Sequence, residues 1–534
     1  MPKGATIINN QEFNSGAQVR LPQNLVTAEL EGMYGSKVLQ DMQQIINLYN
    51  VYDHGADYIA DSGLDYTPAD LKYKKAKALL DKEARFLFSK PPDFFVDVDP
   101  GETKAEKKAN RDAAAVYQTL VDNVLKANQL PKILLRACKD CFIGKRVALM
   151  YNINETTGKI GISFLPSLEF VYDVDPNDAN TLTKIVAFYG LNDAKSKSDQ
   201  RIYKKKYELK NGLCYYTEEV YDGMGNVVET ISPETATKFT FIPAWVIVNE
   251  ALTGDLLGNS EIELLQDYES WYNRMNGADL DAERKGMNPI RWTRDMSPES
   301  TKGLSISAGA YWDLSTDQNA AEGVTGEVGV LDSPMSYSAA LDTTLKRVEN
   351  GMYEQVAVPN VSPDAMKGVV SSGKTLKAIY WDLIVRCDEK MLEWRPALQF
   401  MAECIIEGAR MYPGVLSTYI EDPLPDQPYD IRVDNQYSLP EDEQEEKQID
   451  LAEVNAQTMS KRSYMKKWRN LTDEEADEEL RQIAIERQLL ESSYFNPGGE
   501  PPNNPDQAQN NQDQNQQEEQ NPEQEEPQEE ELAE

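Results

Sequence analysis

The sequence has a single histidine and only five cysteines in 534 residues. His54 lies in the stretch VYDHGAD at an expected helix end, so we interpret it as a terminal or surface histidine. Without further histidines, no histidine-based catalytic triad can be assembled. The odd, low number of cysteines and the lack of an apolar signal segment in MPKGATIINNQEF predict a reducing compartment, a cytoplasmic product and no disulfide framework.

Long hydrophobic runs are missing as well. No apolar run approaches about 18 residues, and the mean hydropathy is -0.59, which argues against a membrane-spanning helix. Hydrophobic residues still make up 40 % of the chain, enough for folded domains. The length predicts about three or four folded units rather than one globule.

Basic residues are outnumbered: 54 Lys and Arg stand against 90 Asp and Glu, for a net charge of -36. From Asn496 onward there are twelve acidic residues and no basic one, which leaves -24 on the rest of the chain. Because affinity for duplex DNA comes mainly from basic side chains that neutralise phosphates, this balance argues against tight wrapping of nucleic acid. A weak contact with DNA is compatible with this charge balance.

The N-terminal half changes its apolar period once. Helical patterns run from Leu30 to about Gly144, with a second helix expected to begin at Pro68 and Asp70 and a third to end at Pro131. From Lys145 the period is two, as in RVALMYNI, GKIGISFL, KIVAFYG and GLCYYTEEVY, with turn signals between these runs. This half therefore predicts helices followed by antiparallel strands.

The C-terminal half begins with a long helical run, NSEIELLQDYESWYNRMNGADLDAERKG, for which Asn259 or Ser260 is a plausible N-cap. A Gly/Ser/Asp-rich insert of short strands follows, and SYSAALDTTLKRVENGMYEQVA predicts a returning helix. A Pro-containing loop leads to another helix, which Pro396 is expected to kink or interrupt. Charged helices come next, and the Pro/Gln/Asn/Glu tract from Asn496 is predicted to be disordered.

Residues 368–375, GVVSSGKT, fit the phosphate-binding pattern G-x-x-x-x-G-K-[ST]. In a nucleotide-binding loop, Lys374 would reach the phosphates and Thr375 would hold Mg²⁺. A nucleotide-binding loop follows a buried strand. The residues before GVVSSGKT include Pro359 and Pro363, which argue against a central strand there. We therefore interpret the stretch as the entry to a helix that is capped by Ser371 or Ser372.

Other chemistry-bearing patterns are weak. Cys138 and Cys141 form a CxxC pair on an expected helix, but no second pair or histidine partner accompanies them, so we expect two buried helix cysteines. No pair of carboxylates stands out for acid/base work. The aromatic residues from Tyr268 to Met275 are spaced for helix packing rather than for base stacking. No catalytic residue, metal ligand or cofactor-binding residue is assigned, and we expect no enzyme.

Three stretches resemble the portal proteins of tailed double-stranded-DNA bacteriophages, of the long-tailed type. They are KALLDKEARFLFSKPPDF, GNSEIELLQDYESWYNRMNG and SPDAMKGVVSSGKTLKAIYWDLIVRCDEK. With the order of the expected elements, the resemblance covers about residues 30–440. It implies an α+β fold with an α/β wing, a two-helix stem, a small α/β clip, a tunnel loop and helix, and an α-helical crown.

The resemblance also implies boundaries for these parts. They are an N-terminal arm (1–30), wing (31–257), first stem helix (258–286), clip (287–335), second stem helix (336–357), tunnel loop (358–372), tunnel helix and wing return (373–439), crown (440–495) and disordered acidic tail (496–534). The candidate DNA-channel residues of the tunnel loop are Asn360, Val361, Ser362, Lys367, Ser371, Ser372 and Lys374. The candidate stem residues are Tyr268, Trp271, Tyr272 and Met275.

What such a protein does is build a ring, usually of about twelve subunits, at one capsid vertex. The genome enters and leaves through this ring, and the implied partners are double-stranded DNA, the major capsid protein, scaffolding protein, the terminase large subunit and a head-completion or adaptor protein. The implied location is the virion, after assembly in the host cytoplasm, with no membrane and no cofactor. Two alternatives stay open: a phosphate-loop NTPase using Gly368–Thr375, and a monomeric scaffold or adaptor protein.

Overall fold

The computed structural model describes residues 6–7, 20–21, 29, 34–58, 67–192, 194, 196–287, 290–304, 312–331, 337–361, 377–437, 443–469 and 471–495. The chain divides into two compact units, Met1–Pro440 and Glu441–Glu534. The length had predicted three or four units. One continuous apolar core in the first unit, which joins helices and strands from Leu48 to Val433, accounts for the smaller number.

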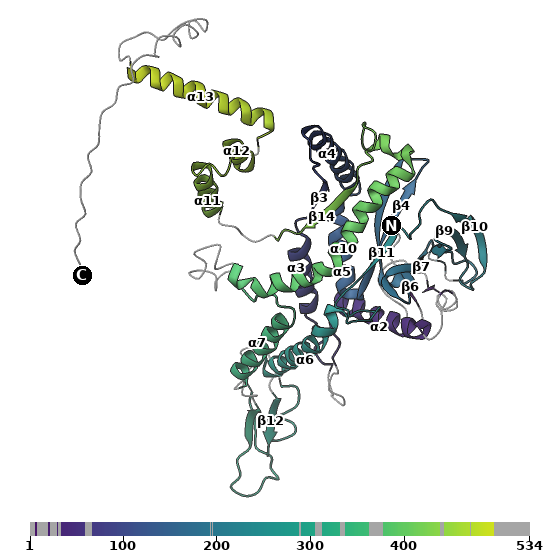
Figure 1. Cartoon of the computed structure of the whole chain (residues 1–534). Helices are drawn as coiled ribbons and strands as arrows, with labels where there is room; N and C mark the ends of the chain where they lie inside the picture. The colour runs from purple at the N-terminus through teal and green to yellow at the C-terminus, as the bar shows by residue number, and fades with distance from the viewer. Residues whose placement is uncertain are drawn as a thin grey trace, which may run out of the picture. The chain divides into compact units, whose positions relative to one another are not determined.

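The first unit is an α+β fold (Figure 1). Its helices are α2 (Tyr34–His54), α3 (Lys75–Phe88), α4 (Lys104–Ala127), α5 (Leu130–Gly144), α6 (Glu261–Met287), α7 (Ser338–Gln355) and α10 (Trp381–Met411), with 3-10 turns η1 (Ser167–Glu169) and η2 (Pro413–Thr418). Its strands are β1 (Thr6–Ile7), β2 (Arg20–Leu21), β3 (Asp93–Val98), β4 (Arg146–Asn154), β5 (Lys159–Pro166), β6 (Phe170–Asp175), β7 (Asp178–Gly190), β8 (Ile202–Lys210), β9 (Leu213–Tyr221), β10 (Val227–Ala236), β11 (Ala244–Val248), β12 (Ile290–Arg294), β13 (Glu327–Leu331) and β14 (Tyr429–Asp434).

Two antiparallel sheets confirm the strands expected after Lys145. A five-stranded meander has the order β10-β9-β8-β7-β6, and a three-stranded sheet has the order β11-β4-β5. Residues 146–151 of β4 are all buried, which shows that both faces of the smaller sheet are covered. Helices α5 and α10 pack against this sheet. On the meander, Met42 and Ile45 of α2 pack with Val186 and Phe188 of β7.

The helical expectation for the N-terminal region is wrong at two places. Residues 93–98 form a strand that pairs with β14 in the register Val96↔Ile431. The second helix begins at Lys75 rather than at Pro68, and residues 67–74 have no regular secondary structure. Local sequence could not show either feature, because the partner strand lies more than 300 residues away along the chain and the 67–74 segment is held by a distant helix.

Helices α6 and α7 lie side by side and lead to the β12–β13 pair (Figure 1). The Ser260 hydroxyl accepts a hydrogen bond from the Ile262 N–H at 3.1 Å and so caps α6, as one of the two expected N-caps. The strands IRWTR and EVGVL of the insert form the antiparallel pair, with Trp292 directly opposite Gly329. A Cβ atom on Gly329 would lie 2.5 Å from the indole ring, so glycine is required there.

Helix α10 continues through Pro396, so the proline does not interrupt it. The helix changes direction partway along its length (Figure 1), and Pro396 stands in the middle of its residue range. Its expected apolar face is confirmed at Leu383, Cys387 and Met391, which are all buried.

The second unit contains α11 (Glu443–Asn455), α12 (Lys461–Arg469) and α13 (Asp473–Phe495), as the charged helical patterns had predicted. Helix α12 is basic and lies between two acidic helices in sequence. Its cations pair with both: Lys467 with Asp450 at 2.8 Å, and Arg469 with Glu479 at 2.8 Å. Residues 496–534, the predicted disordered tail, lie outside the described part of the chain.

Candidate functional site

A row of polar side chains on α6 fixes the segment 67–74 along that helix. Asp281 Oδ1 accepts a hydrogen bond from the Ala69 N–H at 3.0 Å, and Asn273 Oδ1 accepts one from the Tyr73 N–H at 2.8 Å. Glu269 Oε1 accepts one from the Lys75 N–H at 2.9 Å. The three acceptors are four and eight residues apart and therefore share one face of α6. The helix thus holds a segment that has no regular secondary structure and no sheet partner of its own.

Glu269 also caps α3 from outside that helix. Lys74, the N-cap residue of α3, makes no side-chain capping bond, and Lys75 is the first residue of the helix. The buried Glu269 carboxylate takes the place of the missing cap. Burial raises the pKa of Glu269 to about 7, while the hydrogen bonds from the Lys75, Ala76 and Ala56 backbone act in the lowering direction.

Replacing Glu269 with alanine should therefore destabilise the first unit. Its removal leaves buried N–H groups at the start of α3 without an acceptor, at a cost of about 1–3 kcal/mol. Glu269→Gln keeps an acceptor oxygen and should lose less than about half of that. Urea unfolding of the two variants and the parent tests this. Equal losses in both variants would show that the charge, and not the capping bond, matters.

The α6–α7 pair contains the four candidate stem residues. Tyr268 packs against Gly351 of α7, where an added Cβ would lie 2.9 Å from the phenol ring. Tyr272 is buried and meets Tyr73 edge to face at 5.4 Å. Met275 is half-buried. These contacts agree with the interpretation that the aromatic cluster serves helix packing. Trp271 is an exception, because it is 57 % exposed.

A buried ionic cluster joins α3, α6 and α10. Arg386 and Lys390 stand one turn apart on α10, and three carboxylates face them. Arg386 contacts Glu83 of α3 at 2.9 Å and Glu250, just after β11, at 2.6 Å. Both cations also contact Glu261, the first residue of α6. Three carboxylates against two cations leave the cluster one negative charge in excess when all five groups are ionised.

The carboxylates of this cluster respond differently to burial. Burial and the neighbouring Glu261 raise the pKa of Glu83 to about 7, against the lowering effect of Lys390 and Arg386. Lys390 and Arg386 hold the pKa of Glu261 at about 2 although burial acts to raise it. Glu83 Oε2 is buried and has no hydrogen-bond partner among the described residues. A proton on Glu83 near neutral pH removes the excess charge.

Sequence reasoning missed this cluster. Its members are spread from residue 83 to residue 390, and each charge looks like an ordinary surface residue in its local sequence. The signal that was present is the pair Arg386 and Lys390, two cations at i and i+4 next to the buried positions Cys387 and Met391. A basic pair beside an apolar stripe indicates buried carboxylate partners, since charged residues are rarely buried unless paired.

The predicted DNA-channel loop is described only at its start. Asn360 donates a hydrogen bond from Nδ2 to Asn350 Oδ1 of α7 at 2.9 Å, and Val361 is half-buried. Ser362, Lys367, Ser371, Ser372 and Lys374, together with the GVVSSGKT stretch, lie outside the described residues. Helix α10, which carries Arg386 and Lys390 of the ionic cluster, comes after this segment in the chain.

The remaining candidates lie in ordinary structural positions. Cys138 and Cys141 are buried on α5, as expected, and burial raises the pKa of the Cys138 thiol. His54 is the exposed last residue of α2. Within the described ranges, no group of three or more His, Cys, Asp or Glu side chains is arranged to hold a metal ion. Among those same residues, no helix has the length and apolarity needed to cross a membrane.

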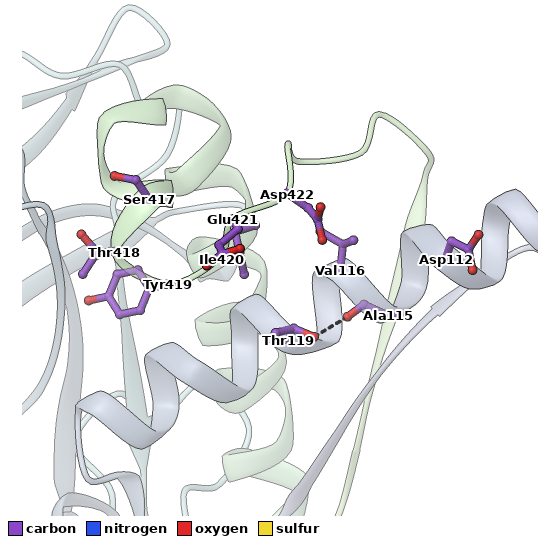
Figure 2. A pocket seen from close by; sticks show the side chains of 10 residues that line it. All are labelled: Asp112, Ala115, Val116, Thr119, Ser417, Thr418, Tyr419, Ile420, Glu421 and Asp422. Carbon is purple, nitrogen blue, oxygen red and sulfur yellow. Dashed lines mark hydrogen bonds between the residues drawn. The ribbon is translucent and has the colours of Figure 1, made fainter.

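An open groove of about 660 Å³ lies between α4 and the segment that follows η2 (Figure 2). Its lining includes the carboxylates of Asp112, Glu421 and Asp422 and contains no lysine or arginine. The hydrogen bond drawn in Figure 2, from Thr119 Oγ1 to the Ala115 carbonyl, stays within α4. An acidic groove without a cation repels phosphate, so this feature does not suit a nucleotide.

Comparison with known families gives a match over most of the chain. The model described as phage portal protein, SPP1 Gp6-like, matches residues 36–489. The match contains α6, α7, β12, β13, α10 and the ionic cluster, and it reaches into α13 of the second unit. No curated protein matches the chain.

Proposed function

Since the chain belongs to the phage portal protein family, we propose that it forms the ring through which a viral genome enters and leaves the capsid. Portal proteins are structural components of the phage capsid rather than catalysts. The ring is proposed to contain about twelve copies at one vertex. The wing, stem, clip, tunnel loop and crown keep the boundaries given above as proposals.

The observation that carries this proposal is the α6–β12–β13–α7 arm. Its side chains Trp271, Met287 and Val330 are large, apolar and more than half exposed in the single chain. A two-stranded ribbon is at best marginally stable by itself, and β12–β13 exposes Trp292 and Val328 as well. Neighbouring copies around a ring would cover these side chains, because a cyclic assembly brings two different faces of each subunit together.

The charge of the arm also suits a channel for DNA. Helix α6 carries seven acidic and three basic residues, and three of the acidic ones, Glu261, Glu269 and Asp281, are buried. The other four leave a small excess of negative charge, which repeated around a ring would let the duplex slide, whereas a basic bore would hold it. We propose that acidic side chains of α6 face the channel. Unchanged genome packaging after these side chains are neutralised would contradict this proposal.

The proposed partners follow from this role. They are double-stranded DNA in the channel, the major capsid and scaffolding proteins around the ring, and the terminase large subunit and a head-completion protein at its ends. The proposed location is the virion, after assembly in the host cytoplasm.

Electron microscopy of the purified full-length protein tests the proposal. We expect rings with a central hole about as wide as a DNA duplex. Scattered monomers at high protein concentration would contradict the ring and support the monomeric adaptor.

The phosphate-binding pattern supports one other candidate function, a phosphate-loop NTPase. Equilibrium binding of ATP to the parent protein and to Lys374→Ala separates the two. We expect no saturable binding in either protein. Saturable binding that the substitution abolishes would overturn the structural assignment.

A further inference from the structure

The outward face of α10 is apolar in the middle and acidic along one edge. Trp381, Val385 and Leu392 are 62 %, 40 % and 65 % exposed, and their spacing places them in one row. Asp382 and Glu393 each follow a member of this row by one position, and with Glu389 they form a parallel row of exposed carboxylates at helical spacing. Arg386 lies on the same stripe, but its charge is held in the ionic cluster. Most exposed apolar side chains are scattered singly, whereas a row bordered by charge is typical of a docking surface.

The same unit carries a basic face in spite of its acidic composition. Lys132, Arg136 and Lys139 form a row on α5, whose only acidic residue, Asp140, is half-buried and accepts a hydrogen bond from the Tyr49 hydroxyl. Lys139 reaches Asp81 of α3 at 2.7 Å, and the mostly exposed Arg85 lies 3.6 Å from the same carboxylate. The Lys132 ammonium donates a hydrogen bond to Gln129 Oε1 at 3.3 Å, and the charge of Arg136 acts to lower the pKa of Asp140. The face formed by these side chains and Arg85 thus carries four cations against two carboxylates, Asp81 and Asp140.

The structure assigns these two faces to each other in neighbouring copies: we infer that the outward face of α10 in one subunit docks on the α3–α5 basic face of the next. The inference rests on the proposed ring. The choice of a second copy of the chain as the binding partner rests on charge complementarity, because the acidic row on α10 and the basic row on α5 are opposite in sign and lie on different helices. A ring interface is heterologous, so each subunit must offer two different and complementary faces. Charge of opposite sign on the two faces also rejects the like-with-like pairing that would give a closed dimer.

A charge exchange tests this pairing. One variant carries Asp382→Lys and Glu389→Lys, and the other carries Lys132→Glu and Arg136→Glu. Each variant alone should form at least about tenfold fewer rings than the parent in native mass spectrometry, because like charges meet at every interface. Mixed in equal amounts, the two should form rings in which they alternate, since each α10 face then meets a basic or acidic face of opposite sign.

The outcomes of this test separate the inference from the proposed function. Rings at the parent level in both single variants would overturn the pairing and leave the portal role intact. Monomers in both variants and in the mixture would also overturn it, provided that circular dichroism shows parent-like folding. A parent protein that forms no ring at all would overturn the proposed function itself. If the basic variant forms normal rings but binds DNA more weakly, the basic face serves DNA rather than a second copy, and the inference is wrong.

A second measurement does not depend on any substitution. Isotope-labelled and unlabelled parent protein are mixed, assembled and treated with a zero-length carbodiimide that joins carboxylates to lysine amines. We expect cross-links between labelled and unlabelled chains that connect Glu389 or Glu393 with Lys132 or Lys139. Assembled rings whose inter-chain cross-links avoid both faces would contradict the pairing.

Discussion

Lys390→Met should lower the free energy of unfolding by about 3–5 kcal/mol, the cost of breaking a buried ion pair from one side. Lys390 is 6 % exposed and contacts Glu261, with Asn249 Oδ1 at 3.1 Å and Glu83 at 3.5 Å. Methionine fills much the same space but removes the charge. Three carboxylates would then face Arg386 alone. Glu261 would stay buried with one of its two cationic partners, Arg386. Urea unfolding followed by tryptophan fluorescence provides the measurement.

The control for this prediction lies a few turns away in the chain. Lys377 is exposed, just before α10, and Lys377→Met should change the free energy of unfolding by less than about 0.5 kcal/mol. The double variant Glu83→Gln, Lys390→Met should recover part of the loss, because it removes one of the carboxylates left in excess. A loss that the double variant does not reduce would show that packing at position 390, and not charge balance, decides the effect.

Stability should fall as the pH rises from about 6 to about 8.5, and Glu83 should contribute much of the slope. The folded protein raises the pKa of Glu83 from 4.5 to about 7, so this carboxyl stabilises the fold fully below pH 4.5 and loses that contribution as the pH passes 7. The difference corresponds to about 3 kcal/mol. Glu269, with a pKa also raised to about 7, acts in the same direction.

Other buried carboxyls act in different pH ranges. Burial raises the pKa of Asp140 to about 6, so its contribution is lost mainly below pH 6. Glu261, with a pKa of about 2, stabilises the fold at every pH above 4.5 and loses that effect only in strong acid. Glu83→Gln mimics the protonated side chain and should flatten the slope between pH 6 and 8.5. An unchanged slope in this variant would mean that Glu83 is ionised throughout the range.

The sequence predicted local features well where one helix or one strand pattern carried them. The amphipathic stripe of α10 gave its buried face, and Ser260 was recognised as a possible cap of α6 from residue type alone. Strand β3 was missed because DFFVDV alternates over only six residues and its hydrogen-bonding partner, β14, is supplied from the far end of the unit. The late start of α3 was missed because its cap, Glu269, belongs to another helix.

What the sequence by itself determined is the order of most helices and strands in an acidic α+β chain, and a resemblance of three stretches to the phage portal family. Local patterns suffice for the order of elements, since periodicity and caps depend on neighbours within a few turns. Only the tertiary structure decided which charges are buried. Glu83, Glu261, Arg386 and Lys390 become a single ionic cluster because three helices converge, and the free energy of a charge depends on what surrounds it in space.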